Sequence, residues 1–98
     1  MRKYGFHPEA RAELLAAARY YKAGVPLAAR RFKSEVGRAI RFILAYPEAS
    51  PAVGREGARR KLLSHFPYDL IYLLESDRIR VVAVAHQRRR PGYWTSRL

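Results

Sequence analysis

The chain has 98 residues, 20 of them lysine or arginine and 8 aspartate or glutamate, so its formal net charge is +12 at pH 7. It has no cysteine, which excludes disulfides and thiolate metal sites, and no apolar run approaches the about 20 residues of a bilayer-spanning helix. A charge of this size favours association with a polyanion, although a merely solvated surface is the plainer interpretation. We expect one cytoplasmic domain, residues 1–98, without a signal peptide.

The first half of the chain predicts a short strand followed by two helices. Residues 3–6 form the strand, and Pro8 followed by Glu9 is typical of a helix start. This helix runs to about Lys22, and a second amphipathic pattern runs from residue 26 to about residue 45. The short link between them predicts an antiparallel helical hairpin. The predicted buried stripes are Ala10, Leu14, Ala17, Ala18 and Tyr21, then Ala28, Phe32, Val36, Ala39, Ile40 and Ile43.

The second half predicts a loop over residues 48–57 and then three short strands. The strands cover residue 59 to about residue 65, residues 68–75 and residues 78–86, and they are rich in β-branched and aromatic side chains. Strict alternation along the last strand would place Arg80 and His86 on one face. We therefore predict an α+β fold. A small antiparallel sheet, made of the N-terminal strand and a three-stranded C-terminal meander, packs against an α-helical hairpin.

This order of elements, together with local motifs, resembles the RelE/ParE family of bacterial toxins. The matching residues are Leu27-Ala28, Phe32, Arg60, Leu62, Phe66-Pro67-Tyr68, Leu70-Ile71-Tyr72, Val82-Ala83-Val84-Ala85-His86 and Arg88-Arg89-Arg90-Pro91-Gly92-Tyr93-Trp94. The resemblance implies the toxin of a type II toxin–antitoxin module of the plasmid-stabilisation type. Such a toxin inhibits growth, and a co-encoded antitoxin neutralises it in a hetero-oligomer by binding its helices and sheet groove.

The resemblance leaves two targets open. ParE-like members block DNA gyrase and are not nucleases, whereas RelE-like members cleave messenger RNA on the ribosome without a metal. Asp69 follows Tyr68 where RelE nucleases typically place a catalytic arginine, and an anion there would repel the scissile phosphate. This favours ParE-like inhibition of gyrase or replication. A ribosome-dependent endoribonuclease is the alternative, and a basic nucleic-acid-binding module is a third interpretation.

The cations at the margins of the predicted sheet form the candidate site. A nuclease could use His86 and Tyr93 to carry protons, and Arg60 and Arg88 to hold the phosphate. Under either mechanism we expect the target to contact a basic rim. The rim comprises Arg59, Arg60, Lys61, Arg80, His86, Arg88, Arg89 and Arg90.

Each candidate also has a structural interpretation. His86 could be a strand-end histidine bonded to the backbone, and Tyr93 with Trp94 could close the core as an aromatic clip. The arginines of the second helix are expected to form a solvated face, and His65 is expected to be exposed without a role. We expect no metal and no other cofactor, because no histidine or carboxylate pattern has metal-ligand spacing.

Overall fold

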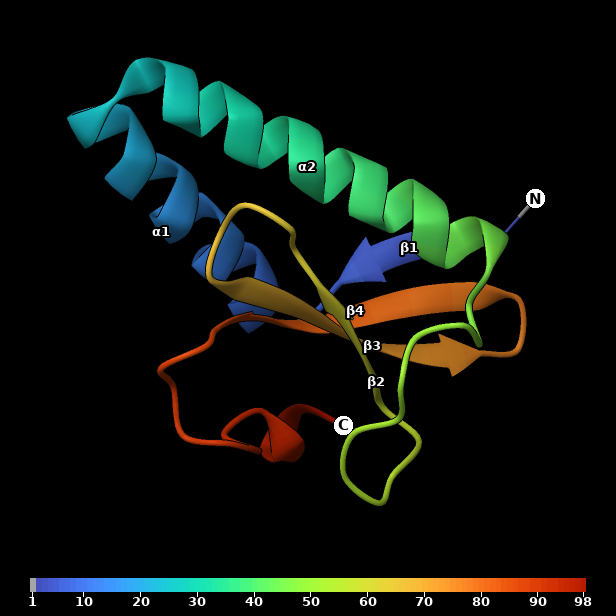
Figure 1. Cartoon of the computed structure of the whole chain (residues 1–98). Helices are drawn as coiled ribbons and strands as arrows, with labels where there is room; N and C mark the ends of the chain where they lie inside the picture. Colours follow the sequence, from blue (N-terminus) through green and yellow to red (C-terminus); the bar gives the residue numbers. More distant parts are fainter. Residues whose placement is uncertain (1) are drawn as a thin grey trace.

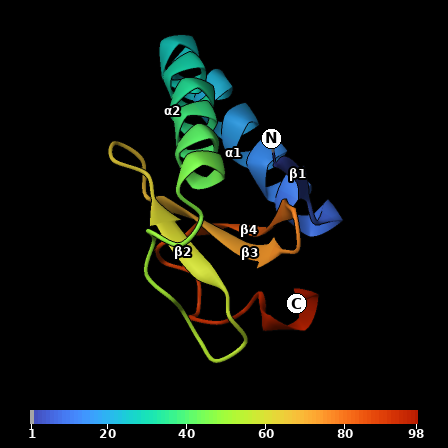
Figure 2. The same ribbon diagram turned by 90° about the vertical axis from the view of Figure 1, so that its right-hand side faces the viewer.

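The protein is described by a computed structural model that covers residues 2–98. Two helices lie across one face of a four-stranded sheet, and the C-terminal segment lies against the other face (Figures 1 and 2). The predicted α+β fold is confirmed. The elements are β1 (Lys3–Phe6), α1 (Pro8–Gly24), α2 (Pro26–Ala45), β2 (Arg59–Leu62), β3 (Tyr68–Glu75), β4 (Arg78–His86) and a short 3-10 helix, η1 (Thr95–Arg97).

The sheet has the strand order β1-β4-β3-β2. The last three strands form the predicted antiparallel meander, but β1 pairs with β4 in parallel, so the sheet is mixed. The chain turns into α1 directly after β1, where the His7 amide donates to the Val81 carbonyl at 2.8 Å. Because β1 is short, it covers the edge of β4 only as far as Val81.

Strand β2 ends at Leu62, three residues earlier than predicted. The Leu63 amide still bonds to the Tyr68 carbonyl at 3.1 Å, but the next two residues leave the sheet. The amides of Ser64 and His65 donate to the Glu35 carboxylate on α2 instead of to a strand. The turn between β2 and β3 is therefore bonded to the helical layer.

The sheet is buried on both faces. On the helix side, Phe32 and Tyr72 are fully buried in a large cluster that includes the predicted stripes of both helices except Ala28. Ala28 is only half-buried, and its neighbour Ala29 is buried instead. On the other side, Trp94 is 4% exposed and belongs to a second cluster with Ile71 and Ala83. Neither helix within residues 2–98 is both long enough and apolar enough to span a membrane.

A bulge in β4 changes which side chains share a face. Ile71 lies opposite Ala83 and Tyr72 lies opposite Val81, so Val82 has no partner on β3. Val82 and Ala83 both join the cluster away from the helices, whereas Val81 and Val84 join the helix-side cluster. One extra residue thus reverses the alternation for the rest of the strand.

The prediction that Arg80 and His86 share a face is therefore wrong. The Arg80 guanidinium donates to the Arg97 carbonyl at 3.1 Å, on the side of the C-terminal segment. The His86 ring packs edge-on against Tyr68, 5.0 Å between centroids, and Tyr68 packs against the helix-side cluster. Strict alternation fails because it assumes an unbroken pairing register.

Candidate functional site

Residues 87–98, which we call the strap, cross the sheet face that the helices leave open (Figure 2). Trp94 is buried against this face, and Tyr93 and Leu98 pack beside it. The strap is fixed to the sheet where it begins, because the Gln87 amide donates to the Pro67 carbonyl at 2.9 Å. The interpretation of Trp94 as part of an aromatic clip is confirmed.

A cavity of about 120 Å³ lies between the strap and the sheet, and it gathers part of the predicted rim. Arg60 enters its wall from β2, and Arg89 and Arg90 enter from the strap. Asp69 lies in the same wall, is 7% exposed and accepts a hydrogen bond from the Gln87 amide group at 3.3 Å. The fold thus brings three arginines and one buried carboxylate to a single site.

The other predicted rim cations lie elsewhere. Arg59 donates to the backbone carbonyls of residues 48 and 50, so it ties the preceding loop to β2. The Lys61 ammonium lies 4.4 Å from the centre of the Phe42 ring on α2, and Arg80 pairs with Glu75 at 3.2 Å. Arg59 and Lys61 face the helices because side chains alternate along β2, and Arg80 lies on the strap side but at the other end of β4 from His86.

His86 borders the same cavity at the end of β4, although its ring lies on the other face of the sheet, against Tyr68. The imidazole Nδ1 accepts the Arg88 amide hydrogen at 3.0 Å, so the neutral ring carries its proton on Nε2. Arg88 is exposed at the turn into the strap, and its backbone amide is bonded to His86. His86 is thus bonded to the backbone at one nitrogen, as its structural interpretation expects.

Tyr93 is held by a carboxylate on α1. Its hydroxyl donates to the Glu13 Oε2 atom at 2.7 Å. Burial raises the pKa of Tyr93, and the hydrogen bond to Glu13 raises this pKa further. A phenol with a raised pKa that donates to an anion is poorly suited to shuttling protons near neutral pH.

Glu13 organises a network that sequence analysis missed. It accepts the Val84 amide at 3.0 Å and two guanidinium N–H groups of Arg97 at 2.9 and 3.0 Å. Burial raises the pKa of Glu13, but the bonds from Arg97, Tyr93 and the Val84 amide together lower it below its ordinary value. Glu13 lies three residues after Ala10 and four before Ala17, so its position in the buried stripe was the signal that could have revealed it.

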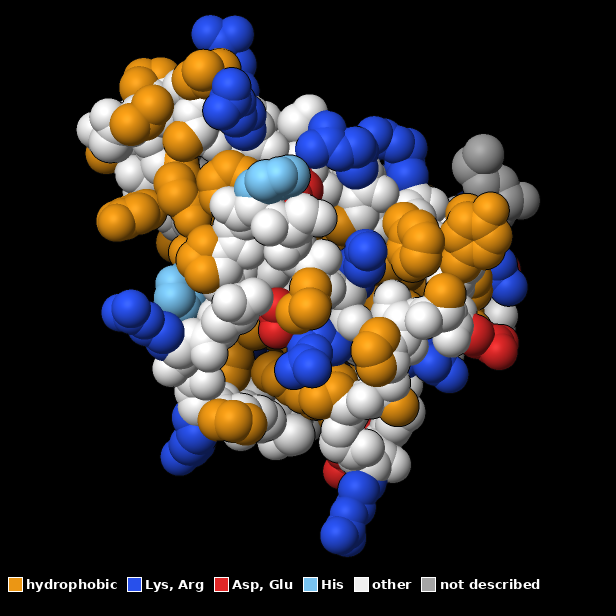
Figure 3. All heavy atoms as spheres, viewed as in Figure 1, with side chains coloured by type: hydrophobic (Ala, Val, Ile, Leu, Met, Phe, Trp, Pro, Cys, Tyr) orange, Lys and Arg blue, Asp and Glu red, His pale blue; other side chains and the backbone are white. Residues whose placement is uncertain are grey.

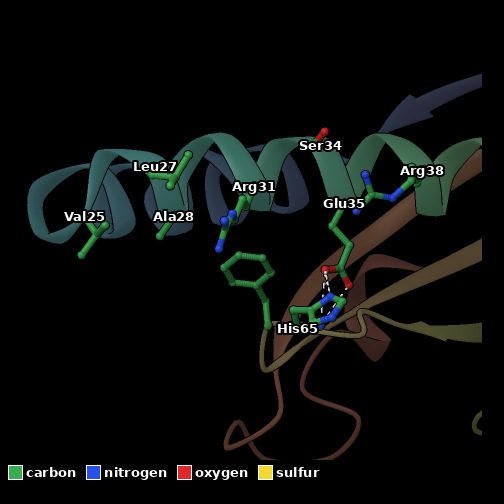
Figure 4. A pocket seen from close by; sticks show the side chains of 9 residues that line it. Val25, Leu27, Ala28, Arg31, Ser34, Glu35, Arg38 and His65 are labelled. Atoms are coloured by element: carbon green, nitrogen blue, oxygen red, sulfur yellow. Dashed lines mark hydrogen bonds and ion pairs between the residues drawn. The ribbon is translucent and has the colours of Figure 1, made fainter.

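A larger cavity of about 570 Å³ lies between α2 and the β2–β3 turn. Arg31 and Arg38 flank Glu35 along α2, and Glu35 points at His65 on the turn (Figure 4). An adjoining cavity of about 220 Å³ shares Glu35, Arg38 and His65, so the two form one groove along the helix. The remaining lining residues of the larger cavity are Val25, Leu27, Ala28, Ser34 and Phe66.

The groove has an apolar end and a cationic middle. Val25 and Leu27 are 59% and 51% exposed, and hydrophobic side chains gather at this end of the hairpin, with Lys and Arg beside them (Figure 3). The His65 ring is exposed, as expected, but its Nδ1 lies 3.0 Å from Glu35 Oε1, so it helps to hold the turn. Burial raises the pKa of Glu35, and the hydrogen bonds from His65 and Ser64 lower it by more.

Residues 4–91 match the family described as "ParE toxin of type II toxin-antitoxin system, parDE". The chain belongs to the ParE toxin family. The match runs from Tyr4, within β1, to beyond the end of β4, and it ends before Tyr93, Trp94 and Arg97 of the strap. The RelE/ParE resemblance found in the sequence is confirmed at the level of the family.

One similar solved structure is titled "Chromosomal ParDE TA system from P. aeruginosa". It shares 17% identity with this ParE-family chain, with a TM-score of 0.75, and the alignment covers 88% of this chain and 96% of that chain. At this identity the likeness supports the fold alone. No curated protein matches the chain.

Proposed function

We propose that this ParE-family toxin arrests growth by binding DNA gyrase and blocking replication. The observation that carries the proposal is that, within residues 2–98, only one of the two candidate proton carriers keeps an unbonded group for proton transfer, the Nε2 atom of His86. Tyr93 donates to Glu13 at 2.7 Å, and His86 accepts a backbone amide through Nδ1. Metal-free RNA cleavage needs a free base and a free acid, whereas a binding inhibitor needs only a complementary surface.

The contact with the target is assigned to the arginines around the strap cavity. Arg60, Arg89 and Arg90 are exposed cations that line one cavity, and Arg88 is exposed at the start of the strap. Guanidinium groups bind carboxylates in bidentate fashion, which suits recognition of an acidic protein surface. Asp69 is buried among them, and its charge disfavours a phosphate in the same cavity.

A ribosome-dependent endoribonuclease is the competing function. Its transition state carries extra negative charge on the phosphate, which needs cations without a neighbouring anion. Of the two candidate proton carriers, Tyr93 is bonded to the Glu13 carboxylate, and His86 is bonded only through Nδ1 within residues 2–98. A nuclease would therefore have to transfer protons through His86 Nε2. If the protein is a nuclease, its toxicity should depend completely on His86. If it is a binding inhibitor, its toxicity should not.

We further propose that the groove along α2 receives the antitoxin. Exposed Val25 and Leu27 would contact apolar side chains of the antitoxin. Arg31 and Arg38 would pair with its carboxylates. An acidic amphipathic segment meets both requirements, and the net charge of +12 favours its association. Because the groove lies on the helix side and the strap on the other, the antitoxin and target surfaces are largely separate.

Induced expression of the toxin, with His86 variants as the comparison, tests the proposed target. We expect filamentation and a DNA damage response before protein synthesis falls. His86→Gln should retain toxicity, whereas a nuclease that depends on this proton carrier should lose on the order of 100-fold in cleavage rate on His86→Ala. Rapid loss of translation with transcripts cut at codon boundaries would reverse the assignment.

Co-expression with the product of the adjacent gene tests the partner. We expect growth to be restored and a stable complex to be recovered by pull-down. Leu27→Glu should weaken this complex without reducing toxicity. Growth arrest that persists in the presence of the partner, with no complex formed, would count against the antitoxin assignment.

A further inference from the structure

The edge of β4 is left open beyond β1, and two side chains take the place of a strand there. No strand within residues 2–98 pairs with this edge after Val81. Glu13 accepts the Val84 amide at 3.0 Å, and Arg97 donates to the Val82 carbonyl at 3.0 Å. Because buried backbone groups need partners, this pair both closes the sheet edge and fixes the strap to it.

The same carboxylate is linked to the rim through one aromatic ring. Glu13 Oε2 accepts a hydrogen bond from the Tyr93 hydroxyl, and the Arg89 guanidinium carbon lies 3.9 Å from the centre of the Tyr93 ring. Arg97 also lies over this ring, at 5.1 Å. Within residues 2–98, no carboxylate forms an ion pair with Arg89, so its contact with the ring is its main restraint.

We propose that Glu13 is the positioning residue of the target-binding surface. It holds the Tyr93 ring, the ring holds Arg89, and Arg89 is thereby kept beside Arg60 and Arg90 at the strap cavity. An unrestrained arginine pays conformational entropy when it binds, so a held arginine binds its partner more tightly. The functional part of this inference rests on the proposed contact between the rim and the target.

Nuclear magnetic resonance tests the link without any target. Protons above an aromatic ring are shifted upfield, so the Arg89 side-chain signals should be upfield in the unaltered protein. Glu13→Gln and Tyr93→Phe should move them toward their ordinary positions. Glu9→Gln is the matched control, because Glu9 pairs with Arg97 at 3.1 Å but is 65% exposed. Unshifted Arg89 signals in the unaltered protein, or the same shift in all variants, would overturn the proposal.

Fluorescence separates a displaced side chain from a detached strap. Trp94 is the single tryptophan, and its side chain is buried between the strap and the sheet, so its emission reports docking of the strap directly. We expect Tyr93→Phe to keep the Trp94 emission unchanged while the Arg89 signals move. If the Arg89 signals move only when the Trp94 emission moves, Glu13 acts on the whole strap and the specific link is wrong.

A double-mutant cycle tests the functional consequence. Glu13→Gln and Arg89→Ala should each weaken toxicity roughly tenfold at matched expression, the effect expected from one hydrogen bond to a charged group. The double variant should be as toxic as Arg89→Ala alone, because both changes remove the same contact between Arg89 and the target. Additive losses would overturn the positioning role. Full toxicity of Arg89→Ala would instead show that the rim does not contact the target. The resonance shift would then report only a structural contact between Tyr93 and Arg89.

Discussion

Replacing Glu35 with glutamine should loosen the β2–β3 turn from α2. The Glu35 carboxylate accepts the amides of Ser64 and His65 and faces the His65 ring, and its side chain is only 9% exposed. Glutamine offers one oxygen and places donors against the remaining amide. A hydrogen bond to a charged acceptor contributes about 1.5–3 kcal/mol, so we expect the free energy of unfolding to fall by about 2 kcal/mol at pH 7.

The pH dependence of this loss has a definite sign. The pKa of Glu35 in the folded protein lies below its ordinary value of 4.5, because the bonds from His65 and Ser64 outweigh the effect of burial. A depressed carboxyl pKa contributes stability that is present above the unfolded pKa and is lost as the pH falls through the folded pKa. The difference between the two proteins should therefore be complete at neutral pH and shrink below pH 4.5.

Urea unfolding followed by Trp94 fluorescence measures both effects. Glu48→Gln is the matched control, because Glu48 is exposed and its side chain has no hydrogen bond or ion pair within the described chain. It should change stability by less than about 0.5 kcal/mol. A Glu35→Gln loss no larger than that of the control, or a loss that does not shrink in acid, would refute the assignment.

Three further predictions concern stability, toxicity and partner binding. Tyr72→Phe should lower the free energy of unfolding by about 1–2 kcal/mol in urea titrations, because the buried hydroxyl donates to the Pro47 carbonyl at 2.7 Å. Arg60→Ala should weaken growth inhibition while changing stability by less than about 0.5 kcal/mol, whereas Arg41→Ala should retain both. Leu27→Glu should reduce antitoxin affinity about tenfold or more in calorimetric titration, since the bound antitoxin would bury the new charge at the apolar end of the groove.

Much of the fold could be predicted from the sequence, because its main signals are local. Pro8 and Pro26 begin the two helices where they were predicted to begin, and helical periodicity identifies most of the buried stripes. The bounds of β3 and β4 follow from two apolar runs separated by a polar pair. The parallel direction of β1 could not be predicted, since it depends on which neighbour the first strand joins after the sheet forms.

The site was predicted less completely, because it depends on register and on contacts between distant residues. One unpaired residue, Val82, places Arg80 and His86 on opposite faces, and no local pattern marks that bulge. The role of Glu13 depends on Tyr93 and Arg97, which lie 80 and 84 residues further along the chain. Arg89 and Arg90 were named correctly as neighbours of Arg60 because the strap follows directly from β4.

We propose above all that the toxin inhibits gyrase through Arg60, Arg89 and Arg90 at the strap cavity. The most direct test is DNA supercoiling by purified gyrase, titrated with the purified toxin and with its Arg60→Ala variant. We expect the toxin to inhibit supercoiling, the variant to require a higher concentration, and the purified antitoxin to restore activity. Undiminished supercoiling at toxin concentrations that halt cell growth would contradict the claim.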